Sequence, residues 1–391
     1  MFGNVSRTLK RFLKPYLRKG LRCLPVRKDK IVFLNYTGKG FGDNAKYIAE
    51  EILRRGLPWK LIWLVDGDAY VPDTIKKVQN RFGLKAFYEL STAGCIINNC
   101  KSTLPSFFRK KEDQFYLQTW HGDFALKYIE KEVEDILPAS YVAKSKTDSA
   151  MTDAAVSGSR SFSKILKESF WLPEKCSILE YGVPRNDLYF RGDTYRRELK
   201  QSYGFLPNER ILLYAPTFRD HDETDCYNLD FEGLRKVLCL ATKEEWKIIV
   251  RLHSVASKRT DLFHYGETVI NGTDCPDQQE LCMISDYLVT DYSSIIGDFL
   301  LMRKPVFLYV PDLERYASRS AGRGLRDMYY HLPLSCSRTQ RKLEEQMTHF
   351  DSELYNREVD SFMKEYYHSF DDGHASERIV DFLTRIMQSG L

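Results

Sequence analysis

Short apolar segments alternate with amphipathic segments along most of this chain, and the alternation breaks near residues 190–205 before it starts again. This pattern is typical of parallel β-α-β units, in which helices cover both faces of a buried sheet. The predicted strands are 31–36, 59–65, 95–98 and 113–120 in the first half, and 210–215, 246–252, 287–290 and 305–310 in the second. The sequence therefore predicts an α/β protein with two Rossmann-like, doubly wound domains that face a central cleft.

With 391 residues the chain is long for a single hydrophobic core, which also favours more than one domain. Helices are expected at 44–55 and 71–82. The expected regions are an N-terminal segment at 1–30, a first Rossmann-like domain at 31–195, a second at 196–345, and helices at 346–391 that pack back toward the first domain. Ligands of open parallel sheets bind at the carboxyl ends of the strands, so polar residues at those ends are the candidate site.

The first thirty residues carry ten lysines and arginines against a single acid, Asp29, and their apolar residues recur near helical spacing. A basic amphipathic segment suits an anionic membrane surface. A disordered basic arm, or a helix packed on the body of the protein, would have the same composition. The prediction is peripheral contact with the inner face of the membrane.

The composition argues against several other classes of protein and binding partner. A net charge of +4 is too small to point to nucleic acid. Nine scattered cysteines without a C-x-x-C pair argue against a disulfide framework or a zinc knuckle and favour a reducing compartment. No apolar run is long enough to span a membrane, and the N-terminus lacks the apolar core of a signal peptide. A cytoplasmic protein is expected.

The most informative polar segment follows the predicted strand at 287–290. Thr290, Asp291, Tyr292, Ser293 and Ser294 form a polar turn, and apolar residues then recur at helical spacing. Hydroxyls and unpaired N–H groups at a helix N-terminus favour a bound phosphate. Ser and Asp are also the commonest helix caps, so a simple cap is the alternative interpretation.

Polar residues follow several other predicted strands in the same way. They are His121 in Q-T-W-H-G, Arg185 and Asn186 in Y-G-V-P-R-N-D, Thr217 and Arg219 in A-P-T-F-R-D, and Arg251 and His253 in R-L-H-S. Arginine binds phosphate in a bidentate way, and histidine accepts protons near neutral pH. Each residue alone also fits a structural role in a turn. Together those of the second half predict a pyrophosphate site that needs no metal.

The order of these motifs, followed by K-P-V-F-L-Y-V-P-D-L-E-R-Y, resembles the CDP-glycerol glycerophosphotransferase family, which includes teichoic-acid primases and polymerases and related capsule enzymes. The resemblance implies a GT-B-like fold with an acceptor domain and a CDP-donor domain. It also implies transfer of a polyol phosphate from a CDP-alditol to a hydroxyl of a polymer or lipid-linked primer, with release of CMP and without a metal or other cofactor. Family members associate peripherally with the membrane.

The same resemblance implies roles for individual residues. His121 matches the proposed base, His253 the histidine at the donor phosphates, and Ser293 and Ser294 the serines at the pyrophosphate. The remaining expected substrate-binding residues are Asn44, Arg185, Asn186, Thr217, Arg219, Arg251, Thr290, Asp291 and Asp298, the last with either the ribose or a structural partner.

Two positions depart from the family pattern. Ser254 replaces the usual proline after His253, and Asp123 replaces the usual threonine after W-H-G. Asp123 is expected either to orient His121 and raise its pKa, or to repel an anionic acceptor. Two other functions stay open: a GT-B glycosyltransferase that uses a nucleotide sugar, and a non-enzymatic membrane scaffold. The sequence does not name the polyol or say how many units are added.

Overall fold

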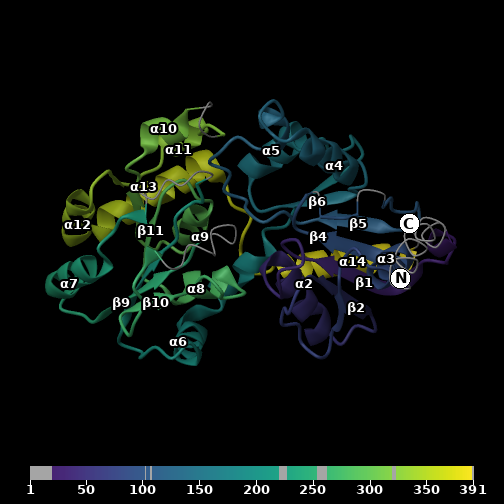
Figure 1. Ribbon diagram of the computed structural model, residues 1–391, viewed down its shortest axis with the longest axis horizontal. Helices are drawn as coiled ribbons and strands as arrows, with labels where there is room; N and C mark the ends of the chain where they lie inside the picture. The colour runs from purple at the N-terminus through teal and green to yellow at the C-terminus, as the bar shows by residue number, and fades with distance from the viewer. Residues whose placement is uncertain are drawn as a thin grey trace, which may run out of the picture.

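The computed structural model describes residues 20–101, 103–105, 108–219, 227–252, 262–318 and 323–389. These residues form two lobes, each built around one all-parallel sheet (Figure 1). Among them, no helix combines the length and the apolar character needed to cross a bilayer. The basic residues 1–19 lie outside the described residues.

The sheet of the first lobe has the strand order β3-β2-β1-β4-β5-β6-β7. Its strands are β1 (Arg27–Leu34), β2 (Lys60–Val65), β3 (Lys76–Gln79), β4 (Ala93–Asn98), β5 (Phe115–Gln118), β6 (Ala154–Ser157) and β7 (Ser177–Glu180). Residues 31–34 of strand β1 are apolar on both faces because both faces are covered there. Ile31 and Phe33 pack toward α2 (Asp43–Arg54), whereas Val32 and Leu34 pack toward α3 (Leu84–Thr92).

The sheet of the second lobe has the order β10-β9-β8-β11-β12-β13. Its strands are β8 (Arg210–Tyr214), β9 (Trp246–Val250), β10 (Val269–Asn271), β11 (Tyr287–Thr290), β12 (Val306–Tyr309) and β13 (Cys336–Ser337). Strand β11 lies between β8 and β12 at the centre of the sheet. Leu288 packs toward α9 (Ile295–Leu301) on one face and Val289 toward α7 (Phe231–Thr242) and α12 (Gln340–Thr348) on the other.

Helices complete both lobes. Those of the first lobe also include η1 (Glu130–Val133), α4 (Ala139–Ser149), α5 (Arg160–Ser169) and η2 (Pro184–Phe190). Those that follow are α6 (Gly192–Ser202), α7 (Phe231–Thr242), α8 (Gln278–Ile284), α9 (Ile295–Leu301), α10 (Leu313–Ala317), α11 (Asp327–Tyr330), α12 (Gln340–Thr348), α13 (Ser352–Phe362), the π-helical turn η5 (Met363–Tyr367) and α14 (Ala375–Ser389).

The chain returns to the first lobe near its C-terminus, first at Tyr367 and Ser369 and then through its last helix. Tyr355 and Val359 of α13 lie in the core of the second lobe, whereas Ile379 and Leu383 of α14 lie in the core of the first. Figure 1 shows this crossing in yellow, with α14 beside α2 and β1. Lys46 of α2 adds a second connection through ion pairs with Asp277 and Glu280, at 2.7 and 2.5 Å. The domain limits proposed from the sequence stay predictions.

The prediction of a helix over 71–82 is wrong. Val71, Ile75 and Val78 are buried at near-helical spacing, but the segment contains the edge strand β3. In β3 only Val78 is buried, because the other side chains of this edge strand face solvent. The pattern of one buried residue among lysines and a glutamine is compatible with either a helix or a strand in so short a segment.

Candidate active site

A cleft of about 1500 Å³ opens between the lobes. Its walls come from segments that follow parallel strands: His121 after β5 on one side, and Ser293 and Ser294 after β11 on the other. Thr217, Arg219 and Arg251 also line it. The cleft therefore brings together six of the residues predicted from the sequence, at the edge where open parallel sheets bind ligands.

His121 is held in a defined tautomer. Its Nδ1 lies 2.7 Å from the carbonyl oxygen of Asn99. Because a carbonyl oxygen only accepts hydrogen bonds, Nδ1 carries the proton and Nε2 keeps its lone pair. Burial lowers the pKa of His121 below its usual 6.5, although the bond to Asn99 opposes that effect. The imidazole is therefore neutral at pH 7 and can accept a proton at Nε2.

Buried residues fix the backbone around His121. The side-chain amide of Asn44 donates to the carbonyl oxygens of Thr119 and Trp120, at 3.3 and 3.0 Å. Arg185 donates to the carbonyl oxygen of His121 at 2.8 Å and to Asp43 at 2.8 Å. Three of these bonds hold the backbone of residues 119–121, and the bond to Asp43 holds Arg185 itself. The base is therefore positioned before substrate binds.

The loop after His121 packs directly on the opposite wall. A Cβ on Gly122 would lie 2.9 Å from Oγ of Ser294, and one on Gly297 would lie 2.5 Å from Cβ of Phe124. A side chain at the glycine of W-H-G would therefore displace the Ser294 hydroxyl, because the two lobes approach closely here. The base and the polar turn after β11, which we call the D-Y-S-S corner (residues 291–294), are neighbours.

The D-Y-S-S corner is organised by Asp291 more than by helix capping. The Asp291 carboxylate accepts from the backbone N–H of Thr217 at 2.9 Å and from Arg219 at 2.9 Å. The hydroxyl of Ser294 makes no capping bond to α9, and that of Ser293 accepts only a long one, 3.4 Å, from Ile295. Both serine side chains are partly exposed at the cleft, so a simple cap does not account for both of them.

The arginines of the second lobe already have protein partners. Arg219 is buried between Asp291 and Asp312, at 2.9 and 2.8 Å, and stacks on Tyr292 and Tyr316. Arg251 donates to the carbonyl oxygens of residues 272 and 275, at 2.8 Å each, and so holds the loop before α8. We therefore assign both arginines to shaping this wall, in place of the direct phosphate contact expected for Arg219.

Six residues expected to bind substrate lie behind the walls. Within the described part of the chain, the lining of the cleft does not include Asn44, Arg185, Asn186, Thr290, Asp291 or Asp298, all at most 5% exposed. Each has a protein partner: Thr290 donates to the carbonyl oxygen of residue 215, Asn186 donates to Asp371, and Arg185 lies 3.7 Å from Asp298. Their arrangement supports positioning roles, and for Asp298 it favours the structural partner over the ribose.

Asp123 does not orient His121, and this expectation is wrong. Its carboxylate accepts from the backbone N–H of Gly158 at 2.9 Å and from the hydroxyl of Tyr367 at 2.6 Å. It is buried, and it ties the base loop to the crossing segment before α14. The pKa of His121 is lowered, not raised, and the orienting group is the Asn99 carbonyl. A backbone carbonyl leaves no signal in the sequence.

Two further expectations concern His253 and Ser254, which lie outside the described residues.

Other residues of the site were missed from the sequence. Asp43, the partner of Arg185, was not singled out from the sequence, although it directly precedes the expected residue Asn44. Lys127 lines the cleft from the loop after W-H-G and was not singled out.

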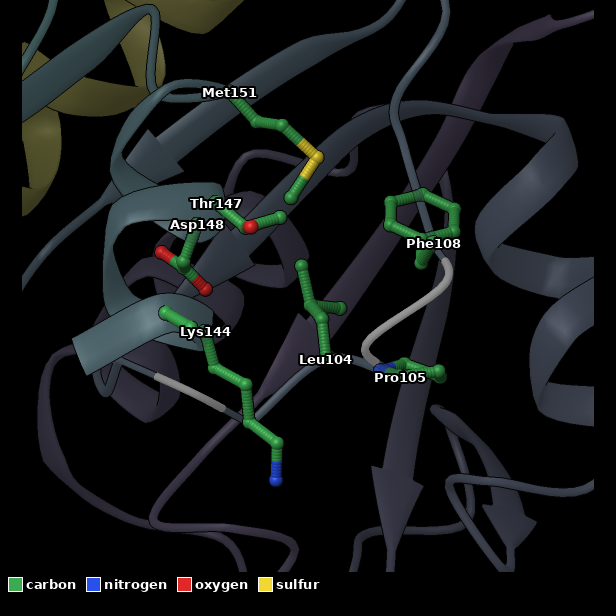
Figure 2. Close-up of a pocket in the computed structure, with 8 residues that line it drawn as sticks. Leu104, Pro105, Phe108, Lys144, Thr147, Asp148 and Met151 are labelled. Atoms are coloured by element: carbon green, nitrogen blue, oxygen red, sulfur yellow. The ribbon is translucent and has the colours of Figure 1, made fainter. Parts of the chain in front are cut away.

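A second cavity, of about 160 Å³, lies in the first lobe away from these residues. Figure 2 shows Leu104, Phe108 and Met151 around it, with Lys144 and Thr147 on the neighbouring helix α4. The acid beside it, Asp148, accepts hydrogen bonds from buried Lys101 and Tyr116. Its one carboxylate is therefore engaged in packing, and we place the active site in the large cleft.

Known proteins share this GT-B-like fold. A solved structure of the wall teichoic acid polymerase TagF superimposes with a TM-score of 0.82 at 26% identity, covering 99% of this chain and 97% of that chain. A teichoic acid poly(glycerol phosphate) polymerase of Bacillus spizizenii is 29% identical over 381 residues, which are 92% of this chain and 93% of that protein.

A teichoic acid glycerol-phosphate transferase of Staphylococcus aureus is 29% identical over 396 residues, 96% of this chain and 98% of that protein. The chain spans about half, 51%, of a matched Staphylococcus epidermidis polymerase. The family model described as CDP-Glycerol:Poly(glycerophosphate) glycerophosphotransferase matches residues 17–385. The family, the GT-B-like fold and the transferase class expected from the sequence are confirmed, and the chain belongs to the CDP-glycerol:poly(glycerophosphate) glycerophosphotransferase family.

Proposed function

We propose that this transferase moves a polyol phosphate, glycerol phosphate or a related alditol phosphate, from a CDP-activated donor to a hydroxyl of a cell-surface polymer or lipid-linked primer and releases CMP. Family membership supports the reaction class. The observation that carries the assignment to this cleft is the position of His121. It is a neutral imidazole with an available Nε2, on a loop that touches Ser294 of the opposite lobe.

In the proposed reaction the acceptor hydroxyl oxygen attacks the β-phosphorus of the donor. The bond between that phosphorus and the bridging oxygen breaks, and CMP leaves with the electron pair. His121 takes the hydroxyl proton at Nε2. Ser293 and Ser294 line the same cleft, and in the proposed reaction their hydroxyls donate to the pyrophosphate oxygens that gain charge in the transition state.

Burial distinguishes the residues that hold the site in place from those that face the substrate. Asn44 and Arg185 hold the backbone of the base loop and do not need to touch the substrate. Arg219 and Asp291 hold the D-Y-S-S corner in the same way. Because these groups are ordered before substrate arrives, the reacting atoms meet a base and hydroxyls already in place.

The decisive experiment compares nucleotide release across donors. CDP-glycerol and CDP-ribitol are incubated with a short polyol-phosphate primer and the wild-type protein, and CMP is quantified. A UDP-sugar that released UDP while both CDP-alditols stayed intact would favour the nucleotide-sugar alternative and contradict the proposal.

The same assay tests the base. We expect His121→Ala to lower the rate of CMP release by about 10²–10⁴-fold, the usual cost of losing a general base, while CDP-glycerol still binds. His349→Ala removes an exposed histidine after α12 and is the matched control, with no expected effect. Normal turnover by His121→Ala would contradict the assignment.

We further propose that the basic residues 1–30 hold the enzyme at an anionic membrane surface, where a lipid-linked acceptor is presented. The support is the excess of ten basic residues over one acid. Sedimentation with vesicles tests this proposal. Full-length protein is expected to bind phosphatidylglycerol vesicles and not phosphatidylcholine vesicles, and a variant without residues 1–19 is expected to bind neither.

A further inference from the structure

Lys127 is a cation of the cleft to which the reaction above gives no role. The loop that carries it leaves the first sheet after β5 and packs on the second lobe, where Phe124 and Leu126 join the core. Lys127 follows directly and lines the cleft. Its backbone is fixed, because it pairs with Leu325 in an antiparallel bridge and its carbonyl oxygen accepts from Arg326 at 3.1 Å.

The ammonium of Lys127 has no counter-ion of its own in the described part of the chain, where no carboxylate or carbonyl oxygen lies within bonding distance of Nζ. The acid that acts on it, Asp291, is already paired with Arg219 at 2.9 Å. Arg219 and Arg323 both act on Lys127 as like charges. The cleft around Lys127 therefore carries an excess of positive charge beside the D-Y-S-S corner.

Burial lowers the pKa of Lys127 to about 8, because burying a cation without a paired anion has an electrostatic cost that disfavours the charged form. An anionic ligand would offset that cost and favour the charged form. Arg219 and Arg251 are committed to carboxylates or carbonyl oxygens, whereas Lys127 is a cleft cation whose charge is available to a substrate.

We propose that Lys127 binds the phosphoryl group that is transferred, by donating a hydrogen bond from its ammonium to a non-bridging oxygen of the donor's β-phosphate. This assignment rests on the proposed function. As the acceptor oxygen bonds to the β-phosphorus and the bridging oxygen leaves with CMP, the transferred group stays anionic and Lys127 stays protonated. His121 alone takes the hydroxyl proton. Lys127 is then a catalytic residue for phosphate charge and not for proton transfer.

The test separates the two phosphates of the donor. Binding of CMP, which lacks the β-phosphate, and of CDP-glycerol is measured by calorimetry for wild type, Lys127→Ala and Lys127→Arg. The matched control is Lys131→Ala, which removes an exposed lysine that follows in η1. We expect Lys127→Ala to bind CMP within twofold of wild type, which also shows that it is folded, and to bind CDP-glycerol about 10-fold or more weakly.

CMP release should fall about 10²-fold in Lys127→Ala, recover in part in Lys127→Arg, and stay normal in Lys131→Ala. Equal weakening of CMP and CDP-glycerol would overturn the proposal. So would unchanged donor binding with a higher KM for the primer, which would assign Lys127 to an acceptor phosphate. A wild-type protein that released no CMP from any CDP-alditol would instead refute the proposed function, and this assignment with it.

Discussion

Two buried arginines, each between two carboxylates, support opposite walls of the cleft. Arg185 pairs with Asp43 at 2.8 Å and lies 3.7 Å from Asp298; we call these three the Arg185 cluster. Arg219 pairs with Asp291 and Asp312, at 2.9 and 2.8 Å; these form the Arg219 cluster. The first supports His121 and the second supports the D-Y-S-S corner.

The clusters differ in what they connect. Asp43 begins α2 of the first lobe and Asp298 lies in α9 of the second, so the Arg185 cluster spans both lobes. The Arg219 cluster draws only on segments after β8, β11 and β12, within one lobe. The two clusters also differ in the pKa of one of their acids, Asp298 in the first and Asp312 in the second. Burial raises the pKa of Asp298 to about 6, although Arg185 lowers it. Burial also acts to raise the pKa of Asp312, but the hydrogen bonds and charge of Arg219, together with the Tyr292 hydroxyl, hold that pKa below its usual range.

The largest effect is expected from Arg185→Leu. The substitution leaves Asp43 and Asp298 buried without their cation, and breaking such a pair typically costs about 3–5 kcal/mol. It also removes the bond to the carbonyl oxygen of His121, so kcat should fall at temperatures where the variant is still folded. Urea unfolding and CMP release measure the two effects. A variant as stable as wild type would show that the interlobe cluster contributes nothing.

A pH series separates the acids of the two clusters. The pKa of Asp298 is higher in the folded state than in the unfolded state, so the folded state binds the proton more tightly. The stability of the wild type relative to Asp298→Asn should therefore fall as the pH rises from about 4 to 6, by at most about 3 kcal/mol. Above pH 6 the difference should stay constant. Asp312 should show the opposite pH dependence. Its contribution to the free energy of unfolding is present above the unfolded pKa and is lost as the pH falls through the folded pKa.

Unfolding of wild type, Asp298→Asn and Asp312→Asn is therefore measured between pH 3.5 and 7.5. Asp298→Asn should gain on wild type as pH rises, and Asp312→Asn should lose. Parallel curves for the two variants would show that the clusters are electrostatically equivalent, contrary to their geometry.

The sequence predicted the elements that build the site better than it predicted the residues that touch substrate. Strands such as β1, β8 and β11 are apolar on both faces, and the loops after them were recognisable for that reason. Strand β6 was missed because Ala154-Ala-Val-Ser157 has few residues that favour strands. Strand β3 was assigned as a helix because one buried residue in a four-residue edge strand defines no period.

Polar residues at strand ends are all candidates in a sequence, because a motif does not say which way a side chain points. Ser293 and His121 line the cleft, whereas Thr290, Asn44 and Asp298 turn into the protein. The partner that decides each case lies far away in the chain: Asp371 for Asn186, and Tyr367 for Asp123. Long-range pairing of this kind carries no local pattern. Lys127 was missed because the sequence does not show that its side chain lines the cleft.

The smallest effect on stability is expected from Arg219→Leu. The Asp312 side chain is 10% exposed and keeps a hydrogen bond from the Tyr292 hydroxyl, and Asp291 keeps its bonds to backbone N–H groups. The cost should therefore be about 1–3 kcal/mol, below that of Arg185→Leu. The kinetic signature should also differ. The D-Y-S-S corner loosens while the base loop stays held by Arg185, so KM for CDP-glycerol should rise more than kcat falls. Steady-state assays of the two leucine variants under identical conditions compare them directly. If both lowered kcat alike and left KM unchanged, the clusters would act on one common structure, and the assignment of one arginine to each wall would be wrong.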